Sequence, residues 1–298
     1  MQYKRVKRVV NGVLLLDKPL GLSSNQALQK VKQFYQAAKA GHTGSLDPLA
    51  TGLLPICFGE ATKFSHFLLD ADKSYRALIK LGQTTATGDA EGEILSSSPV
   101  NVSVLHLKNT LLNFIGEILQ VPPMYSALKH QGKALYEYAR AGVEIERQAR
   151  PVTIFSLALD SFSDERIVIT VHCSKGTYIR TLAEDIGVAL GCGAHLAGLR
   201  RLSTAQFSLK QAVTIDILEA MSTEDRVCML LPVDAAIENM PSITITEESA
   251  YYLKQGQSVW CAGVNLQGYF RVYDENHRFI GLAEQAADGK IAPRRLVV

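Results

Sequence analysis

The sequence predicts a mixed α/β fold of the α+β class, followed by a small β-rich module at the C-terminus. One observation is the helical spacing of apolar residues in separated segments, of which Ser24–Ala38 is the first. A second is the side-chain alternation of Ser74–Leu81, which is typical of a half-buried strand. A third is the stretch Gln257–Val298, where glycines separate short alternating runs.

The length and the prolines indicate two domains. With 298 residues the chain is long enough for about two domains, at ~150 residues per domain. Pro232 and Pro241 bracket an acidic connecting stretch, so we place a boundary near Met240. Residues 1–240 would form the first domain and residues 241–298 the second. Hydrophobic residues make up 47% and charged residues 20%, as in a soluble globular protein.

Charge, cysteines and hydropathy argue against several kinds of protein. Lys and Arg together number 31, and Asp and Glu 29, so the net charge alone requires no polyanionic partner. Arginine doublets such as Arg200-Arg201 are more often solvated than bound to phosphate. The five cysteines form no C-x-x-C pair, which favours buried thiols over a zinc site or disulfides. No apolar run reaches the ~18 residues of a membrane span, and the basic N-terminus leads into no signal-peptide core. We therefore expect a cytoplasmic protein.

The first domain is predicted to begin with a strand and a helix. The apolar run Gly12–Leu16 is typical of a buried strand, which Pro19 stops. Ser23 or Ser24 then caps the helix Ser24–Ala38, whose apolar residues share one face. Two further apolar segments follow a glycine-rich stretch: the run Leu53–Phe58 and the helical stripe in Glu60–Leu69.

That glycine-rich stretch is Gly41–Gly52, GHTGSLDPLATG, and its one carboxylate is Asp47. Glycine permits positive φ and close approach of a backbone or a ligand, while Pro48 stiffens the chain and biases Asp47 away from helical angles. A catalytic carboxylate needs such a shaped loop between two packed elements. Asp-Pro among glycines is equally a common turn signal, so the stretch alone leaves both interpretations open. No Lys-Ser or Lys-Thr follows the glycines, which excludes a phosphate-binding P-loop.

Tyr75 opens the apolar face of the strand Ser74–Leu81. For a tyrosine in that place, core packing with a satisfied hydroxyl is the commoner role. The polar loop Gln83–Glu93 follows, and its Asp89 fits contact with RNA or stabilisation of the loop. Val104–Ile115 then returns to helical spacing.

Residues 116–151 differ in composition from the rest of the chain, because basic and aromatic residues alternate there. The residues concerned are Lys129, His130, Lys133, Tyr136, Tyr138 and Arg140. Proteins use this composition to stack bases and to hold phosphates. A short amphipathic helix, Ala134–Ala141, with solvated lysines is the alternative.

A cation begins the next predicted helix. Two strands, Thr153–Phe162 and Ile167–Cys173, lead to a turn and then to the helix Tyr178–Leu190, with Thr177 as its expected cap. Arg180 lies in the first turn, where a cation opposes the helix dipole. Either an i,i+4 pair with Glu184 or a carboxylate beyond the helix end would explain it, and the sequence favours neither.

Five ordered blocks together resemble the TruB-type tRNA pseudouridine synthases. The blocks are Asn11–Pro19 (NGVLLLDKP), Gly41–Gly52 (GHTGSLDPLATG), Tyr75–Gln83 (YRALIKLGQ), Ser174–Thr181 (SKGTYIRT) and Ala292–Val298 (APRRLVV). Their order and spacing match as well as their letters. The resemblance implies a catalytic domain over 1–240, with a central, mostly antiparallel sheet and flanking helices, and a PUA-like RNA-binding domain over 241–298.

The resemblance further implies an enzyme that isomerises uridine 55, in the T arm of tRNA, to pseudouridine without a metal or a cofactor. The family's essential aspartate falls on Asp47. One carboxylate suffices, because breaking an N-glycosidic bond places positive charge on C1′, as in glycoside cleavage. The carboxylate can stabilise that charge, attack it or remove a proton. The sequence leaves the covalent and the proton-abstraction routes open.

The same resemblance assigns roles to other residues. Tyr75 would stack on the target base, and Arg180 would pair with Asp47 and keep it ionised. Other matched positions line or support the flipped nucleotide (His42, Tyr178 and Leu199) or pack beside the site (Lys18 and Pro19). The family's RNA-gripping insertion falls on 116–151.

The expected partner is therefore tRNA, bound through its T arm, and no obligate protein partner is implied. A non-catalytic tRNA-binding or tRNA-folding protein is one alternative, and a nucleoside or glycoside hydrolase is another. The intact set Asp47, Tyr75 and Arg180 argues against the first as the only role. The lack of a clear second acid motif argues against the second.

Overall fold

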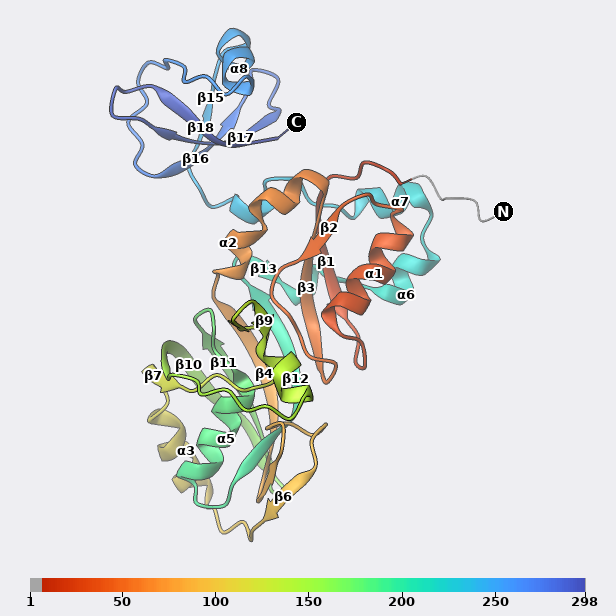
Figure 1. Cartoon of the computed structure of the whole chain (residues 1–298), viewed down its shortest axis with the longest axis vertical. Coiled ribbons are helices and arrows are strands. Elements are labelled where there is room, and N and C mark those ends of the chain that lie inside the picture. The colour runs from red at the N-terminus through yellow and green to blue at the C-terminus, as the bar shows by residue number, and fades with distance from the viewer. Residues whose placement is uncertain (1–6, 298) are drawn as a thin grey trace.

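Ten strands form the central sheet of the computed structural model, which describes residues 7–297 (Figure 1). Its main path is β14-β1-β3-β12-β4-β11-β10-β7, with β2 paired to β3 and β13 to β12. The bounds are β1 Gly12–Lys18, β2 Ala40–His42, β3 Ala50–Phe58, β4 Lys73–Leu81, β7 Gly116–Gln120, β10 Arg150–Ser163, β11 Arg166–Cys173, β12 Ala194–Thr204, β13 Phe207–Ser208 and β14 Val213–Thr214.

The sheet is mostly antiparallel, as predicted. Among its named pairs only β1 with β14 and β3 with β12 are parallel. Outside it lie two short hairpins: β5 Gln83–Thr85 with β6 Ile94–Ser97, and β8 Lys129–His130 with β9 Lys133–Ala134. The loop expected over Gln83–Glu93 therefore begins with a strand.

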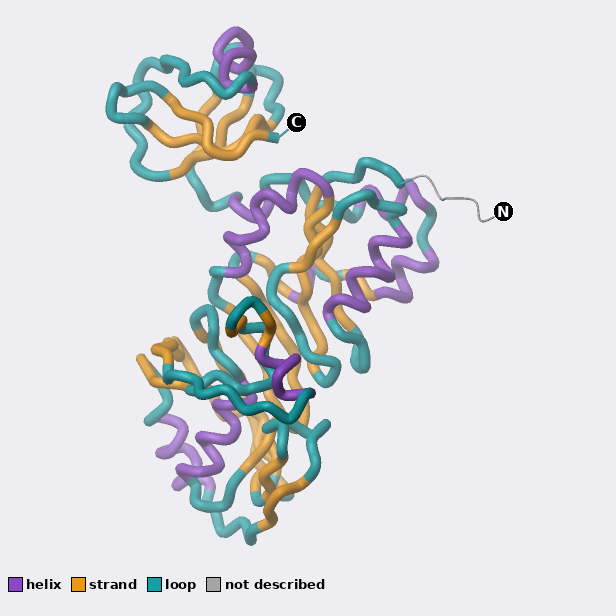
Figure 2. The backbone as a smooth tube through the Cα atoms, in the orientation of Figure 1, coloured by secondary structure: helices purple, strands orange, loops and turns teal. Residues whose placement is uncertain are grey.

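Helices flank the sheet, as Figure 2 shows. They are α1 Ser24–Phe34, α2 Ser65–Leu69, α3 Val104–Leu112, α4 Leu135–Arg140, α5 Ile179–Ala189, α6 Ile215–Ala220 and α7 Thr223–Cys228. Helix α1 begins at a capping box in which Ser23 accepts from Gln26, and it ends at Phe34 rather than Ala38. The helix stops there because Gln36 takes a positive φ of 51°. No helix of the described residues is long and apolar enough to cross a membrane.

The central strand β12 was not predicted. The sequence predicted no element directly after the helix Tyr178–Leu190, and the doublet Arg200-Arg201 was expected to be solvated, yet Ala194–Thr204 is a strand between β3 and β4. Its charged residues hide the strand pattern, since strand interiors are usually apolar. Arg201 is only 1% exposed, so a solvated role for that residue is wrong.

The C-terminal module has its own sheet and core, as the glycine-punctuated pattern predicted. Its strands are β15 Ser242–Thr244, β16 Tyr269–Tyr273, β17 Phe279–Gln285 and β18 Ile291–Leu296, with helix α8 Glu247–Lys254 beside them (Figure 1). Its contacts with the first domain include the rings of Phe64 and Phe279, whose centroids are 5.5 Å apart, and a 2.9 Å ion pair between Arg271 and Asp234.

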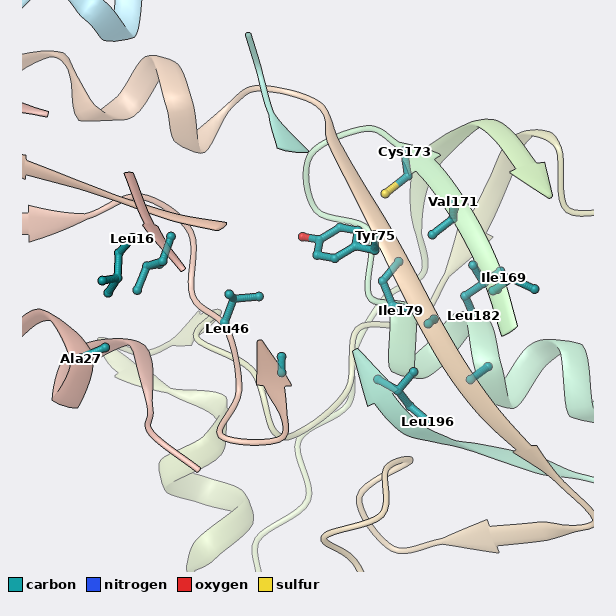
Figure 3. Packing of buried hydrophobic residues seen from close by; sticks show 14 of the residues in the cluster. Leu16, Ala27, Leu46, Tyr75, Ile169, Val171, Cys173, Ile179, Leu182 and Leu196 are labelled. Carbon is teal, nitrogen blue, oxygen red and sulfur yellow. The ribbon is translucent and has the colours of Figure 1, made fainter. Parts of the chain in front are cut away.

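The main core anchors the functional loop between β2 and β3. Leu46, next to Asp47, belongs to the same buried cluster as Tyr75 on β4 and Leu182 on α5. Figure 3 shows the Tyr75 ring projecting from its strand toward the segment that carries Leu46. Packing therefore brings the loop, β4 and α5 to one place.

Candidate active site

Asp47 stands on a loop that is fixed on both sides of it. The backbone N–H of Leu46 donates to Ser24 Oγ (2.6 Å), and that hydroxyl donates to the Leu46 carbonyl (3.0 Å). On the other side, Gly21 N–H donates to the Pro48 carbonyl at 2.9 Å. These bonds hold the backbone, while the Asp47 side chain is 46% exposed and faces a cavity of about 370 Å³.

Arg180, in the first turn of α5, is the cation nearest to Asp47. Its Nε lies 3.4 Å from Asp47 Oδ2, and one of its terminal nitrogens lies 3.4 Å from Asp89 Oδ2. The other terminal nitrogen donates to the Tyr125 carbonyl at 2.5 Å. Of the two arrangements considered for this arginine, the structure shows carboxylates beyond the helix end. One guanidinium thus joins the Asp47 loop, the loop with Asp89 and the insertion.

The expected cap of α5 is wrong. The N-cap is Tyr178, whose side chain makes no capping hydrogen bond. Thr177 instead donates to the Ser174 carbonyl at 2.9 Å and so stabilises the preceding turn. The Tyr178 backbone is held by Gln120, which accepts from its N–H at 3.0 Å and donates to its carbonyl at 3.3 Å.

Asp89 has a more direct connection to the candidate active site than the sequence predicted. It is only 2% exposed, and it accepts hydrogen bonds from Thr87 Oγ1 (2.5 Å) and Glu91 N–H (3.1 Å). A buried carboxylate needs such partners together with a cation, and Arg180 supplies the cation. The unexplained cation in the first helical turn was a signal for a missing anion, but it did not identify which one.

The pKa of Asp47 reflects opposing effects. Burial raises the pKa of its carboxyl above the ordinary value, Arg180 lowers it, Asp89 raises it, and Lys18 lowers it. Desolvation is the largest of these causes, so Arg180 does not hold the pKa of Asp47 below its usual range. A raised pKa makes this carboxylate a better proton acceptor than a free aspartate.

The other residues matched to the family's nucleotide pocket line the same cavity. The cavity wall includes His42, Asp47, Tyr75, Tyr178, Arg180 and Leu199. Tyr75 is 8% exposed, and burial raises the pKa of its hydroxyl. His42 Nδ1 is buried with no hydrogen-bond partner among the described residues. Burial, aided by Arg201, lowers the pKa of His42, so its imidazole is neutral at neutral pH.

Lys18 and Pro19 lie beside this cavity rather than on its wall. Lys18 is fully buried, and its ammonium donates to the carbonyls of Pro19 (2.9 Å) and Leu22 (2.5 Å). Burial lowers the pKa of Lys18 to about 8, and the charge of Asp47 raises it. Both residues line a neighbouring cavity of about 250 Å³.

A larger cavity, about 860 Å³, lies between the first domain and the C-terminal module. On its wall, Arg271 already pairs with Asp234 and donates to the Tyr273 hydroxyl at 2.8 Å. None of the site residues predicted from sequence is on its wall. The smaller cavity around Asp47 is therefore the better candidate active site.

Gly52, on β3 just after the loop, is a position where the fold requires glycine. Its φ is +102°, and a Cβ there would lie 2.3 Å from the Arg201 carbonyl oxygen. We expect backbone strain in Gly52→Ala to lower the free energy of unfolding by about 1–3 kcal/mol, and the clash with the Arg201 carbonyl oxygen to lower it further. Thermal unfolding measures the effect. Gly41→Ala is the matched control, because nothing lies within 4 Å of its Cβ position; equal midpoints for the two variants would contradict the prediction.

Models of known families match nearly the whole chain. Residues 32–179 match the model described as TruB family pseudouridylate synthase, N-terminal domain. Residues 180–238 match the tRNA pseudouridylate synthase B C-terminal domain, and residues 241–297 match the pseudouridine synthase II TruB C-terminal model. A chain of the Cbf5–Nop10–Gar1 complex has the same fold, with a TM-score of 0.72 and 25% identity over 97% of this chain and 85% of that one. The fold and the matched family models thus define a pseudouridylate synthase.

Two relatives make the assignment narrower. A protein of Methylobacillus flagellatus named tRNA pseudouridine synthase B is 66% identical over 100% of this chain and 98% of its own length. A protein of Pseudomonas aeruginosa with the same name is 53% identical over 99% of both chains. The chain belongs to the TruB family of pseudouridylate synthases.

Proposed function

We propose that this chain converts uridine 55, in the T arm of tRNA, to pseudouridine, with Asp47 as the essential carboxylate. The observation that carries the proposal is the meeting of Asp47, Arg180 and Tyr75 on one cavity in a TruB-family chain. The tRNA substrate is inferred from the names of the relatives, which match along the full chain. Uridine 55 is inferred from the resemblance of the sequence blocks.

The size of the cavity supports a single flipped nucleotide as the reacting group. About 370 Å³ is within the ~300–1,000 Å³ of small-ligand sites and is too small for a stacked loop of RNA. Taking the uridine out of its stack costs a few kcal/mol. Stacking of the base on Tyr75, with Tyr178 and Leu199 on the same wall, offsets that cost.

The reaction needs no group beyond one carboxylate. The bond between C1′ and N1 breaks, the base turns, and a bond forms between C1′ and C5. C5 then loses its proton while N1 gains one, so substrate and product are isomers and no water is consumed. Asp47 either attacks C1′ or removes a proton from the sugar, and Arg180 orients it through the 3.4 Å contact. Asp89 pairs with Arg180 from its other side, at 3.4 Å, and so restrains the guanidinium.

Two observations support a contact between neutral His42 and the nucleotide. Its buried Nδ1 has no partner among residues 7–297, and its ring lies on the cavity wall. A buried polar atom without a partner costs free energy that a bound ligand can offset. We assign His42 a substrate-binding role, and Lys18 and Pro19 a supporting role beneath the loop, since the charge of Lys18 acts on Asp47.

Recognition of tRNA is assigned to the insertion 116–151 and to the C-terminal module, which we regard as PUA-like. Basic side chains of the insertion, including Lys129 and Lys133, are exposed, as phosphate contacts require. Figure 1 shows the insertion, with β9 and α4, on the side of the sheet that faces the viewer. Because both parts that are proposed to bind tRNA belong to this chain, we propose that it needs no obligate protein partner. We also propose that it works in the cytoplasm, as the sequence predicts.

The position of the modified uridine tests the proposal. We expect the purified protein to form one pseudouridine per unmodified tRNA transcript, at position 55, and none in a transcript with cytidine there. Mapping of pseudouridine by chemical modification and primer extension measures this. Modification elsewhere would contradict the proposed site in the tRNA, and release of free uracil would indicate a hydrolase. Binding of tRNA without any pseudouridine would support the non-catalytic alternative.

The raised pKa of Asp47 predicts how the rate depends on pH. The ionised carboxylate is lost as pH falls through its pKa. The acid limb of the pH–rate profile should therefore have its midpoint above pH ~3.9, the pKa of a free aspartate. The charge of Asp89 contributes to that rise, so Asp89→Asn should move the limb to lower pH as well as lower the rate. Single-turnover rates across the acid range measure both effects. A limb that stays in place or moves to higher pH in Asp89→Asn would contradict this electrostatic account.

A further inference from the structure

Arg201 is a buried cation that the proposed reaction does not use. It lies on β12, and it is among the largest side chains that are fully buried. Among residues 7–297 it forms no ion pair within 4 Å of a carboxylate, whereas its neighbour Arg200 pairs with Asp17 at 2.6 Å. A buried charge without a counter-ion is costly to the fold. The stability of the fold alone therefore does not explain why an arginine occupies this buried position.

Arg201 contacts two parts of the Asp47 loop region and lies beside Tyr75. Its Nε donates to the Leu53 carbonyl (2.6 Å), and a terminal nitrogen donates to the Gly44 carbonyl (3.1 Å). Gly44 and Leu53 lie on either side of Asp47 in the sequence, so one guanidinium holds the chain on both sides of it. Tyr75 lies opposite Arg201 in the register of β4 and β12, and both residues line the cavity.

The chemistry of the guanidinium fixes the direction of any hydrogen bond to its neighbour Tyr75. Arginine has only donors, so the tyrosine oxygen would accept from Arg201. The phenolic proton would then be left for another acceptor. Arg201 therefore favours a Tyr75 hydroxyl whose oxygen is turned toward the guanidinium.

Close packing leaves this arrangement little freedom. A Cβ at Gly44 would lie 3.3 Å from a terminal nitrogen of Arg201, and Gly44 has a φ of +77°. Strands β3 and β12 run in parallel register here, with Gly52 opposite Arg201. The arginine thus sits between the loop and β4 with backbone against it on the loop side.

We infer that Arg201 is a positioning residue for the reaction, which holds the Asp47 loop and the Tyr75 hydroxyl at a fixed separation across the cavity. The inference rests on the roles proposed for Asp47 and Tyr75. A lysine in its place keeps the charge, but its single ammonium cannot reproduce the bonds that two guanidinium nitrogens make to the Leu53 and Gly44 carbonyls. A small displacement of reacting groups costs about 100-fold in rate even when binding is unchanged.

The test compares Arg201→Lys with Arg200→Lys, the same change at the adjacent, half-exposed arginine. We expect Arg201→Lys to lower the saturating single-turnover rate of pseudouridine formation by about 100-fold, with the dissociation constant for tRNA within about threefold. Arg200→Lys should keep the rate within about threefold. If Arg201→Lys does not fold, as judged by thermal unfolding, Arg201→Gln keeps donors and removes the buried charge, and the same loss of rate is expected.

A double-mutant cycle with Tyr75→Phe separates positioning from general structure. If Arg201 acts through the hydroxyl, Arg201→Lys should cost far less in the Tyr75→Phe background than in the wild type. A folded Arg201 variant with a wild-type rate, a loss confined to tRNA affinity, or effects that simply multiply in the cycle would each overturn the inference. Full activity of Asp47→Asn would instead refute the proposed function, so the two failures are distinguishable.

Discussion

Asp47→Asn is expected to lower the rate of pseudouridine formation by at least about 10³-fold, within the range for loss of a general acid or base. The amide has nearly the same shape, but it can neither attack C1′ nor accept a proton. Affinity for tRNA should stay within about tenfold, because phosphate contacts supply most of it. Single-turnover kinetics and equilibrium binding to the same transcript measure the two quantities.

Stability provides the control for this variant. Since burial raises the pKa of Asp47, the ionised carboxylate opposes folding at neutral pH, and this opposition vanishes as pH falls below the raised pKa. A neutral asparagine removes that cost, so the midpoint of thermal unfolding should not fall. A folded Asp47→Asn protein that binds no tRNA would contradict the assigned role.

Arg180→Lys is expected to have the second-largest effect, a loss on the order of 10²–10³-fold in the saturating rate. Arg180 joins Asp47, Asp89 and the Tyr125 carbonyl, and an ammonium cannot meet all three in this geometry. Single-turnover rates at saturating tRNA measure the loss.

Arg76→Lys is the matched control for the change at Arg180. Arg76 is on the same strand as Tyr75, its side chain is 58% exposed, and its pair with Asp160 lies on the surface, where such pairs contribute little. We expect its rate to stay within about threefold of the wild type. Equal rates for the two lysine variants would show that Arg180 does not orient Asp47.

The parts of the fold that could be predicted are those with a regular apolar pattern. Strand β4 follows from its alternation, and helix α1 follows from its stripe and its Ser23 cap. Strand β12 was not predicted, because its pairing with β3 and β4, rather than the pattern of its own residues, makes Ala194–Thr204 a strand. From the sequence, Arg201 is expected at the surface, because the carbonyls of Leu53 and Gly44 that accept its hydrogen bonds can be identified only in the structure.

The candidate site shows the same division. Asp47, Tyr75 and Arg180 were predicted through sequence blocks, and they line one cavity in the structure, although their catalytic roles remain predictions. Asp89 lies in a polar loop with no distinctive spacing, and only its burial against Arg180 shows its importance. Arg201 likewise matters through its partners, which are 148 and 157 positions away in the chain.

The protein is proposed to isomerise a uridine of tRNA, with Asp47 as the essential carboxylate, and not to release the base. Bond formation between C1′ and C5 must expel the hydrogen on C5, so tritium released from tRNA labelled at uridine C5 reports the reaction directly. We expect the wild-type protein to release one equivalent per tRNA, and Asp47→Asn to release none above background at equal bound tRNA. Equal release by both proteins, or none by the wild type, would contradict the proposal.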